Sequence, residues 1–117
     1  MMHEAFSSEI NVYIAAGATD MRKSINGLSL LVEDHFELDL FSGSLFAFCN
    51  RKRDIVKVLY WSGNGFCIWM KRLEKDVFRW PDSEEEVMKV SRVALDWLLN
   101  GLDFRQAHQR LAYDTIS

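Results

Sequence analysis

Cations and aromatic side chains alternate between residues 50 and 80. The cations are Arg51, Lys52, Arg53, Lys71, Arg72, Lys75 and Arg79, and the aromatic residues are Tyr60, Trp61, Phe66, Trp69, Phe78 and Trp80. Nucleic-acid surfaces combine cations, which hold phosphates, with flat rings, which stack on bases. We therefore predict that the cations contact a DNA backbone and that Trp61 and Trp80 are exposed anchors for a protein partner. Two plainer interpretations stay open: the cations protect a strand edge, and three or four of the rings fill the core.

A second candidate anion site lies at residues 17–23, Gly-Ala-Thr-Asp-Met-Arg-Lys. Thr19 stands where a helix N-cap belongs, which puts Arg22 and Lys23 in the opening turn, where the helix dipole disfavours cations. An anion bound by both side chains and the free backbone N–H groups would remove this conflict. We predict that Arg22 and Lys23 assist DNA binding. The alternative is an ion pair between Arg22 and Asp20 or another acid.

Other residue types do not form a recognisable catalytic centre. His3, His35 and His108 are scattered, and Cys49 and Cys67 stand 18 positions apart among apolar neighbours, which favours core positions over metal ligands or nucleophiles. The aspartates fall mostly at expected caps and turns. We predict that the protein is not an enzyme and needs no metal or cofactor. A magnesium-dependent nuclease would require two or three carboxylates to converge.

Charge is strongly segregated along the chain. The 117 residues have a net charge of -3, which excludes a DNA-coating protein that is basic throughout, yet residues 51–80 alone carry +5. Because salt limits the reach of exposed charge to about 8 Å, this block can attract a polyanion locally. Apolar residues make up 49%, enough for a single domain over residues 1–117. Without a signal peptide or an apolar run of about 18 residues, we expect a cytoplasmic protein that binds no membrane.

The basic block is expected to lie on an antiparallel β-meander. Three β-branched or aromatic runs separated by turn residues form it: 45–50, 55–61 and 66–73. Both sets of alternating residues in the middle run are largely apolar, so helices should cover both faces. Val77–Trp80 is predicted to add a short fourth strand, which Pro81 ends.

Periodicity and capping residues predict the remaining elements. In chain order these are a strand at 10–16, a helix at 20–36, a loop at 39–43, a strand at 87–90, a helix at 92–100 between Ser91 and Gly101, and a helical piece at 105–113. The fold class is α+β. The meander at about 45–80, extended by the strand at 10–16, should pack against two or three helices.

Several short sequence words occur here in an order typical of one family. They are Thr19–Lys23, Gly27–Leu28, Phe41–Gly43, Asn50–Asp54, Leu59–Trp61, Gly65–Trp69, Lys71–Lys75 and Phe78–Pro81. Over about residues 10–103 the chain resembles the TnpB transposase accessory proteins, the second open-reading-frame products of insertion-sequence family 66 elements, which are unrelated to the RNA-guided nucleases of that name. Ser62 and Asn64 depart from the family, where acidic residues are common, and this argues against a metal at their turn.

The resemblance implies a small protein encoded beside a larger transposase and needed for movement of the element. Together with the charge pattern, it favours a non-catalytic accessory factor that contacts element-end DNA through the basic meander. The alternative is an adaptor whose basic block binds an acidic surface of the transposase without touching DNA. The DNA hypothesis depends on one proposition, that the cations converge into a single patch facing solvent.

Overall fold

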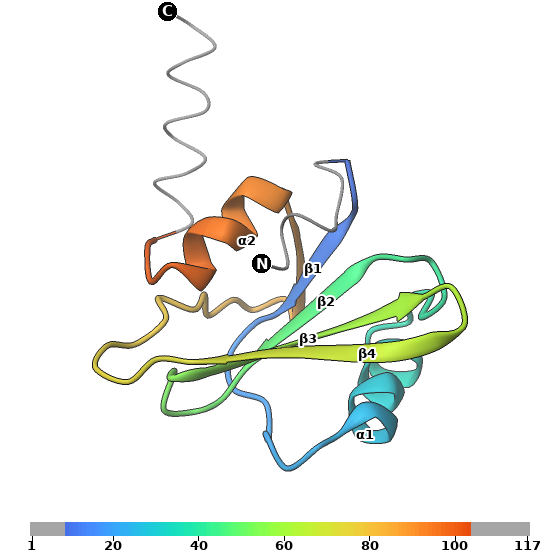
Figure 1. The fold of residues 1–117 in the computed structure, drawn as a ribbon, viewed down its shortest axis with the longest axis horizontal. Helices are drawn as coiled ribbons and strands as arrows, with labels where there is room; N and C mark the ends of the chain where they lie inside the picture. Colours follow the sequence, from blue (N-terminus) through green and yellow to red (C-terminus); the bar gives the residue numbers. More distant parts are fainter. Residues whose placement is uncertain (1–8, 104–117) are drawn as a thin grey trace, which may run out of the picture.

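A five-stranded sheet with the order β4-β3-β2-β1-β5 forms the centre of the molecule. The structure is a computed structural model that describes residues 9–103. The strands are β1 (Val12–Ala15), β2 (Leu45–Cys49), β3 (Ile55–Ser62), β4 (Gly65–Arg72) and β5 (Val87–Val90) (Figure 1). The predicted α+β class is confirmed.

Strands β2, β3 and β4 form the predicted meander. Both neighbouring pairs are antiparallel, with Cys49 opposite Val56 and Ser62 opposite Gly65. The β3–β4 connection is a two-residue turn in which Gly63 has a φ of 63°. This left-handed conformation is accessible to glycine without steric cost, and it keeps the two strands in register.

The strand predicted at 10–16 is present as β1, and its pairing makes the sheet mixed. β1 is parallel to β2, with Val12 opposite Leu45, and antiparallel to β5, with Ile14 opposite Met88. A parallel pair cannot be joined by a hairpin, so residues 16–44 cross over one face of the sheet between β1 and β2. The strand predicted at 87–90 is confirmed as β5.

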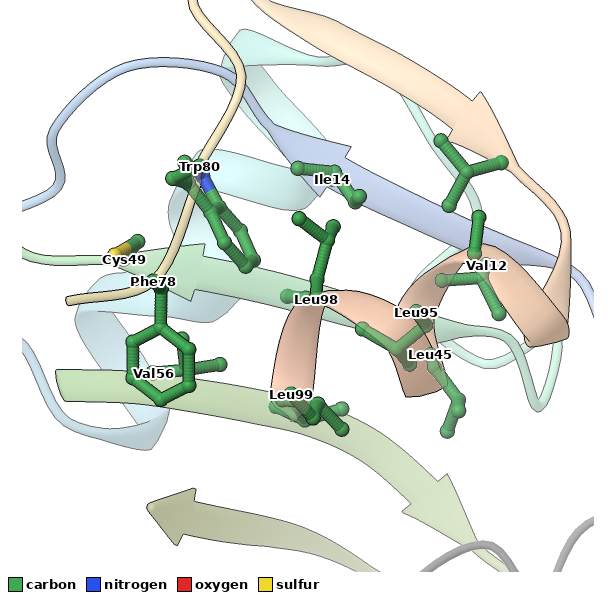
Figure 2. Close-up of a cluster of buried hydrophobic side chains, with 14 residues drawn as sticks. Val12, Ile14, Leu45, Cys49, Val56, Phe78, Trp80, Leu95, Leu98 and Leu99 are labelled. Atoms are coloured by element: carbon green, nitrogen blue, oxygen red, sulfur yellow. The ribbon is translucent and has the colours of Figure 1, made fainter. Parts of the chain in front are cut away.

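Helix α2 (Arg92–Leu99) covers one face of the sheet, as the sequence predicted. The Ser91 hydroxyl accepts a hydrogen bond from the Ala94 N–H at 3.0 Å, and Gly101 ends the helix with a φ of 78°. Figure 2 shows Leu95 and Leu98 packed over side chains of β1 and β2. Full burial of such a side chain contributes about 1.5–3 kcal/mol.

The opposite face is covered by α1 (Ile25–Leu30), which continues into a π-helical turn, η2 (Leu31–His35). Leu28 and Val32 on this helix pack against Phe46, Phe48 and Leu59 of the sheet. The predicted helix at 20–36 is therefore present, but it begins after Ser24. Its first predicted turn is not helical, and the cause lies in the site described below.

Residues 77–80 do not form the predicted fourth strand. Phe78 and Trp80 are 0% and 3% exposed, and the Trp80 indole N–H donates to the Ala15 carbonyl at 2.8 Å. The apolar pattern that predicted a strand thus belongs to an irregular segment that fills the core beside α2 (Figure 2). The helical piece predicted at 105–113 lies outside the described residues. None of the helices within 9–103 is long and apolar enough to cross a membrane.

Candidate nucleic-acid interface

A groove of about 630 Å³ runs between the β1–α1 loop and the β2–β3 turn. Arg51 and Lys52 reach it from the turn, and Arg72 reaches it from the end of β4. The remaining lining residues are Ala18, Thr19, Asp20, Met21, Asn50, Asp54 and Ile55. We call this feature the basic groove; it brings together three of the seven cations predicted between residues 50 and 80.

The β2–β3 turn is held by the Asn50 side chain. Its Oδ1 accepts hydrogen bonds from the backbone N–H groups of Asp54 and Ile55, both at 3.0 Å. Its Nδ2 donates to the Asp54 carboxylate at 2.6 Å. Because these bonds satisfy the turn internally, the side chains of Arg51 and Lys52 are not needed for its structure, and both are exposed.

Long-range contacts hold the β1–α1 loop that forms the other wall. The Thr19 N–H donates to the carbonyl of Cys49 at 2.8 Å. The Lys57 ammonium group donates to the carbonyls of Met21, at 2.8 Å, and Lys23, at 3.2 Å. These carbonyls are bound by a side chain of β3 instead of entering a helix, which accounts for the late start of α1. Lys57 was not among the site residues predicted from the sequence.

Arg22 and Lys23 therefore do not stand in the first turn of a helix, so the helix-dipole argument for an anion site there does not apply, and their part in DNA binding stays a prediction. The alternative, pairing of Arg22 with Asp20, is confirmed, with Arg22 Nη2 2.8 Å from Asp20 Oδ2. The hydrogen bonds from Arg22 lower the pKa of the Asp20 carboxyl to about 2. Lys23 lines a different pocket, of about 230 Å³, that also contains His35 and Glu86.

Neighbouring cations on β4 point to opposite faces of the sheet, as strand geometry requires. Lys71 donates to the carbonyl of Leu99 at 2.8 Å and so satisfies an end of α2. Arg72 lines the basic groove and forms an ion pair with Glu74 at 3.1 Å, with both side chains more than half exposed.

Arg53 supports the segment at 77–82 and does not line the basic groove. Its backbone is left-handed, with a φ of 63°, and its carbonyl accepts from the Phe78 N–H at 2.6 Å. Its guanidinium donates to the Trp80 carbonyl and pairs with Asp82 at 2.9 Å. Arg79 lies beside Arg53, in a further pocket of about 410 Å³ that is lined also by Asp82.

The cations therefore do not form the single patch that the DNA hypothesis assumed. Arg51, Lys52 and Arg72 share the basic groove, whereas Arg53, Lys71 and Arg79 lie elsewhere. Lys75 is exposed in the loop after β4 and lines neither pocket. Within residues 9–103, no ion pair involves Arg51, Lys52, Lys75 or Arg79.

Several of the short sequence words that predicted a family border the basic groove, and comparison with known proteins supports that family. A family model described as IS66 Orf2-like protein matches residues 10–109. The chain belongs to the IS66 Orf2-like family. It is 36% identical over 100 residues to the uncharacterized protein y4hO of Sinorhizobium fredii, covering 86% of this chain and 87% of that protein. It is also 27% identical over 104 residues to the uncharacterized protein y4jC of the same organism, covering 89% of each. No solved structure is significantly similar.

Members of the IS66 Orf2-like family are accessory proteins of IS66 insertion-sequence elements. In this member, the two tryptophans predicted to bind a partner differ in burial. Trp80 is buried, which corrects the prediction of an exposed anchor. Trp61 is partly exposed, in a cluster with Phe41 and Phe66 whose ring centroids lie 4.8–5.4 Å apart. Phe41 is 55% exposed. It was not predicted as a partner-binding residue, because it follows no strand or helix periodicity.

The thiol and acidic groups of this IS66 Orf2-like protein lie in structural positions in the described residues. In the described part of the chain, no three His, Cys, Asp or Glu residues are arranged to hold a metal ion. Cys49 is fully buried, and desolvation raises the pKa of its thiol to about 12. Its predicted core position is confirmed, and Cys67 is partly buried on β4.

Proposed function

We propose that this IS66 Orf2-like protein is a non-catalytic accessory factor of DNA transposition that acts in the cytoplasm and binds the DNA backbone at the element ends through the basic groove. The observation that carries this proposal is the convergence of Arg51, Lys52 and Arg72 on one open groove from separate segments of the chain. An exposed set of cations without structural duties is available to bind phosphates.

The charge balance of the groove supports a small contact with few phosphates. Asp20 is neutralised by Arg22, and Asp54 is the remaining acid among the lining residues. Arg72 is paired with Glu74, but an exposed ion pair contributes only about 0–1 kcal/mol, so a phosphate can replace the carboxylate. We therefore expect about three phosphate contacts, made by Arg51, Lys52 and Arg72.

The groove favours backbone contact over base recognition. Among the described residues, the lining of the groove contains no aromatic ring on which a base could stack. The Asn50 amide, which could otherwise contact a base edge, is occupied by the turn. Binding should therefore depend weakly on DNA sequence and strongly on salt.

Fluorescence anisotropy with a labelled element-end duplex tests the proposal. With about three phosphates neutralised, log affinity should fall with log salt with a slope of about -2.7. Arg51→Ala should make this slope about 0.9 shallower, because one counterion-releasing contact is lost. Lys89→Ala removes another exposed cation, on β5 and away from the groove, and should leave the slope unchanged. Absence of binding at low salt, or equal effects of the two variants, would contradict the proposal.

The ring cluster of Phe41, Trp61 and Phe66 favours a second candidate, an adaptor that binds the transposase of the same element. Exposed aromatic residues are frequent anchors of protein interfaces. Purified transposase should then be retained by the protein without DNA, and Phe41→Ala should weaken retention. Val77→Ala truncates a comparably exposed apolar residue, 46% against 55%, and serves as the control. Unchanged retention by Phe41→Ala would remove this candidate.

A further inference from the structure

Strand β4 is a long edge of the sheet that, within residues 9–103, has no partner on its outer side. It is eight residues long, and among residues 9–103 it pairs with β3 alone. In an antiparallel pair, alternate residues direct their N–H and C=O groups away from the neighbouring strand. The outer side of β4, which lies at one edge of the sheet in Figure 1, therefore presents a row of backbone donors and acceptors that can pair with another strand.

The two edges of the sheet differ in how they are protected. The opposite edge, β5, has four residues, and exposed Lys89 lies within it. Short length and lysine are both common protections against edge pairing. β4 contains no proline and no acid, and five consecutive residues, Phe66–Met70, are uncharged. Met70 is 57% exposed, so an apolar side chain stands at this edge in contact with solvent.

We infer that β4 pairs in antiparallel fashion with β4 of a second copy of this chain, so that two five-stranded sheets join into one of ten strands. The position of charge along β4 favours this occupant. Its cations are confined to the last two positions, Lys71 and Arg72. An antiparallel pair places them beside the uncharged start of the other strand, whereas a parallel pair would bring four cations together.

The pairing leaves each basic groove accessible, because Arg72 remains at an outer end of the shared strand pair. At about 3.4 Å per residue, the two Arg72 residues would stand roughly 20–25 Å apart. The inference does not depend on DNA binding, since it is based only on the free backbone edge and the charges of β4.

Sedimentation equilibrium of the full chain without DNA tests this interface. The wild-type protein should be a dimer. Met70→Lys, which places a cation from each copy near the two-fold axis, should raise the dimer dissociation constant at least about ten-fold. The control is Leu30→Lys on α1, because Leu30 is similarly exposed, 59% against 57% for Met70. This variant should dimerise like the wild type.

Amide hydrogen exchange identifies the strand and checks that Met70→Lys is folded. On dilution of the wild-type protein, the β4 amides that point away from β3 should lose protection, while the β3 amides and the β4 amides bonded to β3 keep it. In Met70→Lys, β3 should stay protected and β4 should exchange as in the diluted wild type. A wild-type chain that stays monomeric at all concentrations would overturn the inference. A dimer in which the β4 amides that point away from β3 exchange independently of concentration would overturn it as well.

Discussion

Arg51 and Arg53 are two positions apart on one turn, yet they serve different regions of the molecule. Arg51 is exposed at the basic groove, where the turn is already satisfied by Asn50. Arg53 does not line this groove and binds the Trp80 carbonyl and Asp82 instead. A cation bound to backbone carbonyls stabilises the fold, whereas a cation free of such duties can bind a ligand.

The same contrast recurs between Lys71 and Arg72 on β4. Lys71 satisfies the end of α2, while Arg72 lines the groove in an exposed ion pair. We call Arg53, Lys57 and Lys71 the structural cations, since each donates to at least one main-chain carbonyl. The basic block of this sequence thus contains both kinds of cation, and their tertiary partners distinguish them.

The largest expected effect concerns the segment that Arg53 supports. Trp80→Ala should lower the free energy of unfolding by about 3–5 kcal/mol, because it removes a large buried side chain. Trp80→Phe keeps most of the ring but leaves the Ala15 carbonyl without its donor, and it should cost less. Urea denaturation measures both. If Trp80→Ala lowered the free energy of unfolding by less than Trp80→Phe does, the result would contradict the buried position of this residue.

Arg53→Ala and Arg51→Ala test the comparison directly. Arg53→Ala should destabilise the protein by about 1.5–3 kcal/mol, because the partly buried guanidinium donates to a main-chain carbonyl and a carboxylate. Arg51→Ala should change stability by less than about 0.5 kcal/mol while weakening DNA binding. Equal loss of stability in the two variants, measured by the same denaturation, would break the distinction between structural and groove cations.

The buried thiol next to this turn makes stability depend on alkaline pH. The pKa of Cys49 is raised from 9.0 to about 12 by desolvation, so the unfolded chain ionises first as pH rises. The contribution is fully present below pH 9 and is lost as pH approaches 12, with a slope of at most about 1.4 kcal/mol per pH unit. In denaturation series across this range, Cys49→Ala should lose stability less steeply than the wild type. Parallel curves would show that Cys49 does not hold its proton in the folded state.

The smallest expected effects concern Lys71 and Arg72, the two cations on β4. Lys71→Ala should lower the free energy of unfolding by about 1 kcal/mol, because one carbonyl at the end of α2 loses its donor. Arg72→Ala should leave stability nearly unchanged and make the salt slope of DNA binding about 0.9 shallower. Thermal unfolding measures the first effect and the anisotropy titration measures the second. A loss of stability in Arg72→Ala together with a shallower salt slope in Lys71→Ala would contradict the roles given to these two residues.

Local patterns were enough to predict much of the fold. Alternating apolar residues and turn-forming residues predicted β2, β3 and β4, and the capping residues Ser91 and Gly101 predicted both ends of α2. These signals lie within a few residues of the structure they produce. The start of α1 could not be predicted in this way, because Lys57, far along the chain, binds the carbonyls of Met21 and Lys23.

The sequence by itself determined the α+β class, the family and the presence of a basic block, because composition, periodicity and short words are properties of neighbouring residues. Only the tertiary structure decided which cations share the basic groove, that Trp80 is buried, and that β4 is an open edge. The physical reason is that a side chain's role depends on the groups that reach it from distant segments. For Arg53 those groups belong to Trp80 and Asp82, and for Lys71 the group is the carbonyl of Leu99.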